Sequence, residues 1–91
     1  MKTVIISGYF SPLHGGHLDL IEGAKALGDR LIVIVNNDKQ QLIKKGKIVL
    51  NENERYRIMK ALRAVDEVIL AVDNDPPVVE TMQNIATDEK Y

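Results

Sequence analysis

Two histidines three positions apart, His14 and His17, lie among glycines near the start of the chain, in the stretch Gly8-Tyr-Phe-Ser-Pro-Leu-His-Gly-Gly-His17. Side chains three positions apart on a helix point to the same side, so both imidazoles can face one anionic group. Gly15 and Gly16 let the backbone come close to a ligand. Free N–H groups in the first turn of a helix favour a phosphate. The spacing therefore indicates phosphate binding.

A metal site is the rival interpretation of such a histidine pair. Structural and catalytic zinc sites take three or four protein ligands. The chain has no cysteine, and neither a third ligand nor an acidic partner stands beside the two histidines. We therefore expect no metal bound by the protein itself.

The elements that would position the pair follow from hydrophobic periodicity. Apolar runs predict strands over residues 3–7, 30–36 and 67–72. Helical spacing predicts a helix over residues 16–27 and another that follows Asn51 and carries an apolar stripe as far as Val65. A turn at residues 74–77 opens a last helix, and residues 86–91 are expected to fray. Residues 39–50 lack clean periodicity and are expected to form mainly a loop.

Alternation of strand and helix predicts an α/β fold with a parallel sheet and right-handed crossovers. Open sheets of this kind bind ligands beyond the carboxyl ends of their strands. The histidine stretch leaves the carboxyl end of the first strand, so it lies where a ligand is expected. A chain of 91 residues is predicted to form one domain.

Charge and composition restrict the partners. Twelve basic and 13 acidic side chains leave a net charge of -1, without the one-sided basic field that nucleic-acid binding needs. Four lysines crowd together at Lys39, Lys44, Lys45 and Lys47, enough to receive a small polyphosphate. No apolar run approaches the ~20 residues of a membrane span. We expect no nucleic-acid or membrane partner and a cytoplasmic location.

The pattern Gly8-x-Phe10-x-x-x-His14-x-Gly16-His17 after a first strand resembles the signature of the cytidylyltransferase-like nucleotidyltransferases. The segments LDLIEGAKALGDRLIVIV, Asn37-Asp38 and ALRAVDEVI look closest to the glycerol-3-phosphate cytidylyltransferase branch. The resemblance implies a Rossmann-like three-layer fold with sheet order 3-2-1-4-5, of which the chain contains strands 1–3. Residues 1–91 would then be the amino-terminal, nucleotide-binding part of a larger domain that continues with a Ser/Thr-rich motif.

The same resemblance implies roles for individual residues. His14 and His17 would contact the triphosphate and stabilise the transition state, with Lys44 neutralising phosphate charge. If the loop register differs, Lys45 or Lys47 could replace Lys44. The remaining nucleotide-binding positions would be Gly8, Tyr9, Phe10, Gly16 and Arg55, while the acidic position Asp38 has an open role. Ser11 stands where the family commonly has Asp, which removes a carboxylate from the loop.

The implied reaction is an in-line attack by the acceptor's phosphate oxygen on the α-phosphorus of the nucleotide, with pyrophosphate leaving. Positioning and charge stabilisation would carry catalysis, so no protein nucleophile is needed. CTP is favoured over ATP, the acceptor would be a phosphorylated alcohol or sugar, and Mg²⁺ would arrive on the triphosphate. The family also implies a homodimer.

Other interpretations stay open at this point. An adenylyltransferase of the same family is one. A nucleotide-binding fragment without turnover is a second, and an assembly module that uses the first strand as its interface is a third. A dehydrogenase is disfavoured because the first loop lacks Gly-x-Gly-x-x-Gly. An aminoacyl-tRNA synthetase is disfavoured by the short chain and the lack of a basic face.

Overall fold

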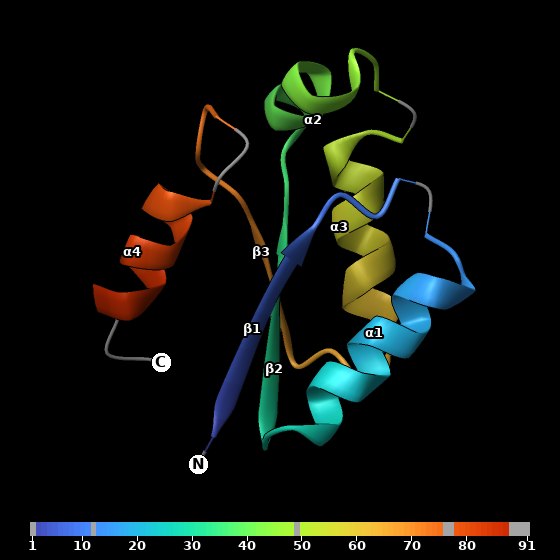
Figure 1. Cartoon of the computed structure of the whole chain (residues 1–91), viewed down its shortest axis with the longest axis vertical. Coiled ribbons are helices and arrows are strands. Elements are labelled where there is room, and N and C mark those ends of the chain that lie inside the picture. Colours follow the sequence, from blue (N-terminus) through green and yellow to red (C-terminus); the bar gives the residue numbers. More distant parts are fainter. Residues whose placement is uncertain (1, 12, 49, 76–77, 88–91) are drawn as a thin grey trace.

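The computed structural model describes residues 2–11, 13–48, 50–75 and 78–87. Its strands β1 (Thr3–Gly8), β2 (Arg30–Val35) and β3 (Glu67–Leu70) form one parallel sheet in the order β1-β2-β3. The helices are α1 (Gly15–Ala26), α2 (Asp38–Lys45), α3 (Glu52–Ala61) and α4 (Val79–Thr87). Helices α1 and α3 lie on one side of the sheet and α4 on the other (Figure 1). The expected α/β fold with a parallel sheet is confirmed.

Strand β2 is the centre of this sheet, and its residues 31–35 are fully buried. Leu31, Val33 and Val35 share a core with Ile21 of α1 and Met59 of α3. On the opposite face, Ile34 packs with Ile85 of α4. Helices on both faces explain why this strand is apolar without alternation. Each large aliphatic side chain buried in this way contributes roughly 1.5–3 kcal/mol.

Strand β1 lies at the edge of the described sheet. It pairs in register with β2, as Ile5 does with Ile32, and no described strand pairs with its other side. Its apolar residues Val4 and Ile6 are only half-buried. Among the described residues, β1 therefore leaves one apolar strand edge unpaired, the kind of edge that natural proteins usually cover.

Helix α2 corrects the expectation of a loop over residues 39–50. The Asn37 side chain accepts the Gln40 N–H at 2.9 Å, and the Gln40 side chain accepts the Asn37 N–H at 2.8 Å, which forms a reciprocal cap. Gly46 ends the helix in the left-handed conformation, with φ 77°. Periodicity missed this helix because its buried residues are Gln40 and Gln41, whereas the apolar Leu42 is exposed.

Two further boundaries differ from the expected ones. Helix α3 begins after its predicted cap, Asn51, but ends at Ala61. Its apolar stripe continues into the following turn, where Val65 still packs against the core. Helix α4 extends to Thr87, so residues 86 and 87 are helical rather than frayed. Its predicted proline start, residues 76–77, and the last residues, 88–91, lie outside the described part.

Helix α4 is instead capped from a distance. The Asp73 carboxylate accepts the backbone N–H groups of Glu80 at 2.7 Å and Thr81 at 3.1 Å. The capping residue Asp73 is itself anchored to the start of α2, because Asn37 Nδ2 donates to the Asp73 carbonyl at 2.7 Å. None of the described helices has the length and apolar character of a membrane span.

Candidate functional site

The chain between β1 and α1, residues 9–14, is named the histidine loop; Pro12 within it lies outside the described residues. The loop leaves the carboxyl end of β1, beside the end of β2 and the start of α3 (Figure 1). This is the edge of the sheet where the sequence predicted a ligand site.

The two histidines build the cap of α1. His14 is the N-cap residue, and its Nδ1 accepts the Gly16 N–H at 3.1 Å. In return, the backbone N–H of His14 donates to Nδ1 of His17 at 3.2 Å. The pair therefore replaces the Ser/Thr and Glu/Gln side chains that usually form a capping box.

This capping determines where each ring carries its proton. A neutral imidazole has one donor and one acceptor nitrogen. Because both Nδ1 atoms accept backbone N–H groups, we assign the ring proton of His14 and of His17 to Nε2. Each histidine thus keeps one Nε2–H donor that the helix cap does not use.

The rings are held in a small stack. The His14 and His17 ring centroids lie 3.9 Å apart with planes tilted by 30°. The edge of Phe10 contacts His17 at a centroid distance of 5.3 Å. Phe10 itself is buried with φ 51°, a left-handed conformation that costs a bulky residue roughly 1–2 kcal/mol. Its ring leaves no room for a side chain at Gly8, where a Cβ would lie 2.8 Å from Phe10 Cζ.

The two glycines between the histidines have different constraints. A Cβ on Gly16 would lie 2.9 Å from Cε1 of His14, so this position must be glycine while the His14 ring caps the helix. A Cβ on Gly15 would meet nothing within 4 Å.

Helix α1 has no acidic residue in its first turn. Its positive end is therefore not neutralised locally and favours an anion.

The surroundings of His17 favour its neutral form. Burial lowers the pKa of His17 below its ordinary value, and the charges of His14 and Lys45 lower this pKa further. A neutral His17 matches the capping geometry, because a protonated Nδ1 could not accept the His14 N–H. The site therefore presents donors without requiring a charged imidazolium.

Arg55 lies beneath the site instead of facing it. Its side chain is 0% exposed. Its guanidinium donates to the Leu50 carbonyl at 2.7 Å, to the Tyr9 carbonyl at 3.0 Å and also to the Asn36 carbonyl. This differs from the nucleotide-binding role expected for Arg55, since the buried side chain has no exposed surface for a ligand. Arg55 ties the histidine loop and the end of β2 to the start of α3.

Asp38 has a clear structural role. Its carboxylate pairs with Nη2 of Arg55 at 2.9 Å, and its backbone N–H donates to the Glu52 carboxylate at 2.8 Å. The acidic position after β2 therefore neutralises the buried Arg55. The sequence showed an acid at this position but could not show its partner.

Among the lysines, the structure brings Lys45 to the loop and leaves Lys44 outside it. Lys45 Nζ lies 3.4 Å from the Ser11 carbonyl. Lys44 is exposed and, within the described residues, its ammonium has no hydrogen bond or ion pair. The sequence did not predict a structural role for Ser11. Its side chain is 8% exposed, and its Oγ accepts the Leu50 N–H at 3.1 Å.

Tyr9 lies between Arg55 and Lys45 and contacts both. Its carbonyl accepts Nη1 of Arg55, and Lys45 Nζ lies 5.3 Å from its ring centroid. Burial raises the pKa of the Tyr9 phenol, and the nearby Arg55 charge offsets part of this rise. Tyr9 is thus positioned at the site, and the predicted contact of its backbone with a nucleotide stays a prediction.

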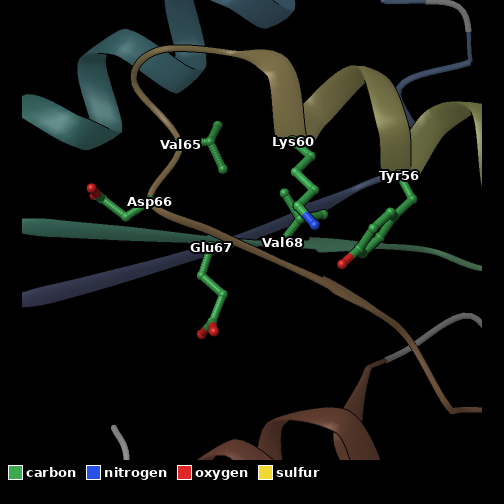
Figure 2. A pocket seen from close by; sticks show the side chains of 6 residues that line it. All are labelled: Tyr56, Lys60, Val65, Asp66, Glu67 and Val68. Carbon is green, nitrogen blue, oxygen red and sulfur yellow. The ribbon is translucent and has the colours of Figure 1, made fainter.

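A separate pocket of about 230 Å³ lies at the amino end of β3, between this strand and α3 (Figure 2), and no residue of the histidine loop lines it. Lys60 and Tyr56 of α3 line one side of it, and Asp66 and Glu67 line the other. Glu67 is paired with Arg30 at 3.5 Å. Sheets of this type bind ligands at the carboxyl ends of their strands, so we do not assign the site to this pocket. No described group of three His, Asp or Glu side chains has metal-binding geometry.

Comparisons with known proteins identify related sequences over most of the chain. The family pattern described as Cytidylyltransferase-like matches residues 5–90. An FAD synthase from Ferroglobus placidus is 43% identical over 75 residues, covering 82% of this chain and 49% of its own. A glycerol-3-phosphate cytidylyltransferase from Bacillus subtilis is 45% identical over 69 residues, covering 76% of this chain and 54% of its own.

The fold is also found in a solved structure. A lipopolysaccharide core biosynthesis protein from Thermoplasma volcanium superimposes with a TM-score of 0.76 at 32% identity, over 94% of this chain and 66% of that one. Among the sequence relatives, the chain spans about half the length of the FAD synthase and of the glycerol-3-phosphate cytidylyltransferase.

Proposed function

Because the chain belongs to the cytidylyltransferase-like family, we propose that it binds a nucleoside triphosphate at the histidine loop and transfers the nucleotidyl group to a phosphorylated small molecule. The observation that carries this proposal is the pair of Nε2–H donors at the start of α1. Two neutral donors beside a positive helix end suit an anion whose charge shifts during the reaction.

The proposed chemistry is a single displacement. A phosphate oxygen of the acceptor forms a new bond to the α-phosphorus of the nucleotide. The bond from that phosphorus to the bridging oxygen of the β-phosphate breaks, and pyrophosphate leaves with the electron pair. His14 and His17 donate hydrogen bonds to phosphate oxygens and hold them in line. No side chain needs to form a covalent bond.

Mg²⁺ is proposed to enter with the triphosphate. The histidine loop contains Ser11 where a carboxylate is common in the family, and both Nδ1 atoms serve the helix cap. Asp38 is engaged by Arg55. The donors present therefore fit an ion held by phosphate oxygens better than one held by protein side chains.

CTP is the proposed nucleotide, with glycerol 3-phosphate or a sugar phosphate as acceptor. The similarity to a glycerol-3-phosphate cytidylyltransferase supports this choice. An adenylyl transfer from ATP is the second candidate, because several relatives are FAD synthases. The homodimer and the cytoplasmic location expected from the sequence stay predictions.

Pyrophosphate release tests the proposal. The purified chain would be given Mg²⁺ with CTP or ATP and a panel of phosphorylated alcohols and sugars. His17→Ala is the test variant, and Glu22→Gln, exposed on α1, is its control. Turnover with one substrate pair that is lost only in His17→Ala supports the function. Nucleotide binding without turnover would support a fragment that needs further chain, and absence of both would refute the proposal.

A further inference from the structure

The pocket between α3 and the amino end of β3 contains chemistry that the proposed function does not use (Figure 2). Its volume of about 230 Å³ suits a molecule smaller than those that fill sites of roughly 300–1,000 Å³. Val65 and the buried Val68 give it an apolar side. Tyr56 and Lys60 lie four positions apart on α3, so both side chains reach the pocket from the same face of the helix.

The two carboxylates that line the pocket are already paired with other cations. Asp66 accepts a hydrogen bond from Lys25 Nζ, and this bond is the largest of the effects that lower the pKa of Asp66. Glu67 is paired with Arg30 at 3.5 Å. Neither acid therefore needs Lys60 as its counter-ion.

Lys60 keeps a charge that no neighbour compensates. It is exposed, and none of the ion pairs between described residues includes it. Its Nζ lies 5.8 Å from the centroid of the Tyr56 ring, and an aromatic face attracts an ammonium without neutralising it. The Tyr56 hydroxyl also has no hydrogen-bond partner in the part of the chain that the structure describes.

The groups that the pocket leaves available are therefore donors, whereas its acceptors are engaged. An ammonium has three N–H donors, and a phenol has one O–H donor. An anionic oxygen group can accept from both, and hydrogen bonds of this charge-assisted kind are stronger than neutral ones. The two valines add a surface that a hydrocarbon part of the same molecule would cover.

We propose that this pocket is a second ligand site, which binds a small organic anion, a carboxylate or a phosphate ester. Its charged group contacts Lys60 and Tyr56, and its apolar part contacts Val65 and Val68. The pocket lies at the amino ends of the parallel strands and the histidine loop at their carboxyl ends, so the two sites do not overlap. The inference is independent of the proposed function, because it uses no residue of the histidine loop.

NMR titrations of the whole chain with butyrate and, separately, with butyl phosphate test the site. The signals of Val65 and Val68 should shift and saturate, with a Kd of about 1–10 mM for so small a ligand. 1-Butanol has a similar apolar part without the charge and should bind at least about fivefold more weakly. Saturable binding of either anion supports the site, and the tighter of the two identifies the charged group that the pocket prefers.

Three variants show whether the predicted donors hold the anion. Lys60→Met removes the charge and keeps a long side chain, so it should weaken binding about fivefold or more. Tyr56→Phe removes only the hydroxyl and should weaken binding about two- to threefold. Arg57→Met is the control, because Arg57 is exposed on the same helix and does not line the pocket. Its affinity should stay within about 1.5-fold of the parent, as expected for a solvent-screened charge.

The same titrations contain the results that would overturn the proposal. Equal binding of 1-butanol and butyrate would show an apolar groove without an anion site. Equal losses in Lys60→Met and Arg57→Met would show a general effect of surface charge. Shifts confined to Gly16 and His17 would place the anion at the histidine loop instead, and an absence of saturable shifts at Val65 and Val68 would remove the site altogether.

Discussion

Nδ1 of His17 accepts the backbone N–H of His14 at 3.2 Å, so the second histidine of the motif closes the helical turn that the first one begins. The same side chain therefore has a structural nitrogen and a separate chemical nitrogen. Substitutions that keep only one of these two functions distinguish helix capping from ligand binding.

His17→Asn and His17→Ala separate the two functions. Asparagine can place Oδ1 where Nδ1 accepts the N–H but has no group at Nε2. We expect its free energy of unfolding to stay within about 0.5 kcal/mol of the parent. Its kcat/KM for pyrophosphate release should fall about 100-fold or more. Alanine loses the cap as well, so it should be about 1 kcal/mol less stable than the asparagine variant and as weakly active. Equal losses of stability in the two variants, or full activity in His17→Asn, would contradict this separation.

Acidification should weaken the fold through His17. Its pKa in the folded state is lowered from the ordinary 6.5, by burial first and then by the charges of His14 and Lys45. Below pH 6.5 the unfolded chain binds a proton that the folded chain resists, so stability falls as pH drops toward the folded pKa. Urea unfolding at several pH values between about 7.5 and 5.5 should show this loss in the parent. The loss should be smaller in His17→Asn, and identical slopes would count against the lowered pKa.

Gly16→Ala should disturb the site while Gly15→Ala should not. The new methyl group at Gly16 would lie 2.9 Å from Cε1 of His14, so the ring must leave its capping position. We expect about tenfold weaker binding of nucleoside triphosphate, from the loss of one charge-assisted hydrogen bond. Gly15→Ala has free space and should stabilise the helix by up to about 1 kcal/mol. Calorimetric titration and thermal unfolding of both variants would check this difference.

Arg55→Met should strongly destabilise the fold. The substitution leaves the carbonyls of Tyr9, Asn36 and Leu50 without their donor and Asp38 without its partner. We expect a loss of about 2–4 kcal/mol in the free energy of unfolding. The exposed neighbour Arg57 gives the control, because Arg57→Met should change it by about 0.5 kcal/mol or less. Urea unfolding near neutral pH measures both. Similar values for the two variants would show that the buried arginine network contributes little.

Asp73→Ala should loosen α4. Desolvation raises the pKa of Asp73, but hydrogen bonds from the Thr81 hydroxyl and from the backbone N–H groups of Glu80 and Thr81 outweigh it and leave the pKa lowered. Removing this cap should cost about 1 kcal/mol. Asp75→Ala, at an exposed neighbouring position, should be nearly neutral. Hydrogen exchange of the Thr81 amide would localise the effect, and unchanged protection in Asp73→Ala would rule out the cap.

Local pattern was sufficient for the strands and for the position of the histidine pair. The uninterrupted apolar run of β2 predicts burial on both faces, and residues 31–35 are buried. The spacing of His14 and His17 next to glycine predicts two rings at one helix start, and their centroids lie 3.9 Å apart. These features depend on neighbours within a few residues, so their physical cause can be read from the sequence alone.

Tertiary contacts decided the features that depend on partners distant in the chain. Helix α2 buries glutamines, whose amides bond to carbonyls such as that of Asp75, so apolar periodicity could not reveal it. Arg55 is buried because three carbonyls and Asp38 converge on it from separate segments. The sequence by itself determined which kinds of residue gather at the carboxyl edge of the sheet. Only the folded chain decided that Arg55 supports the loop from below and that Lys45 reaches it, because the direction of a long charged side chain depends on the acceptors that tertiary packing places around it.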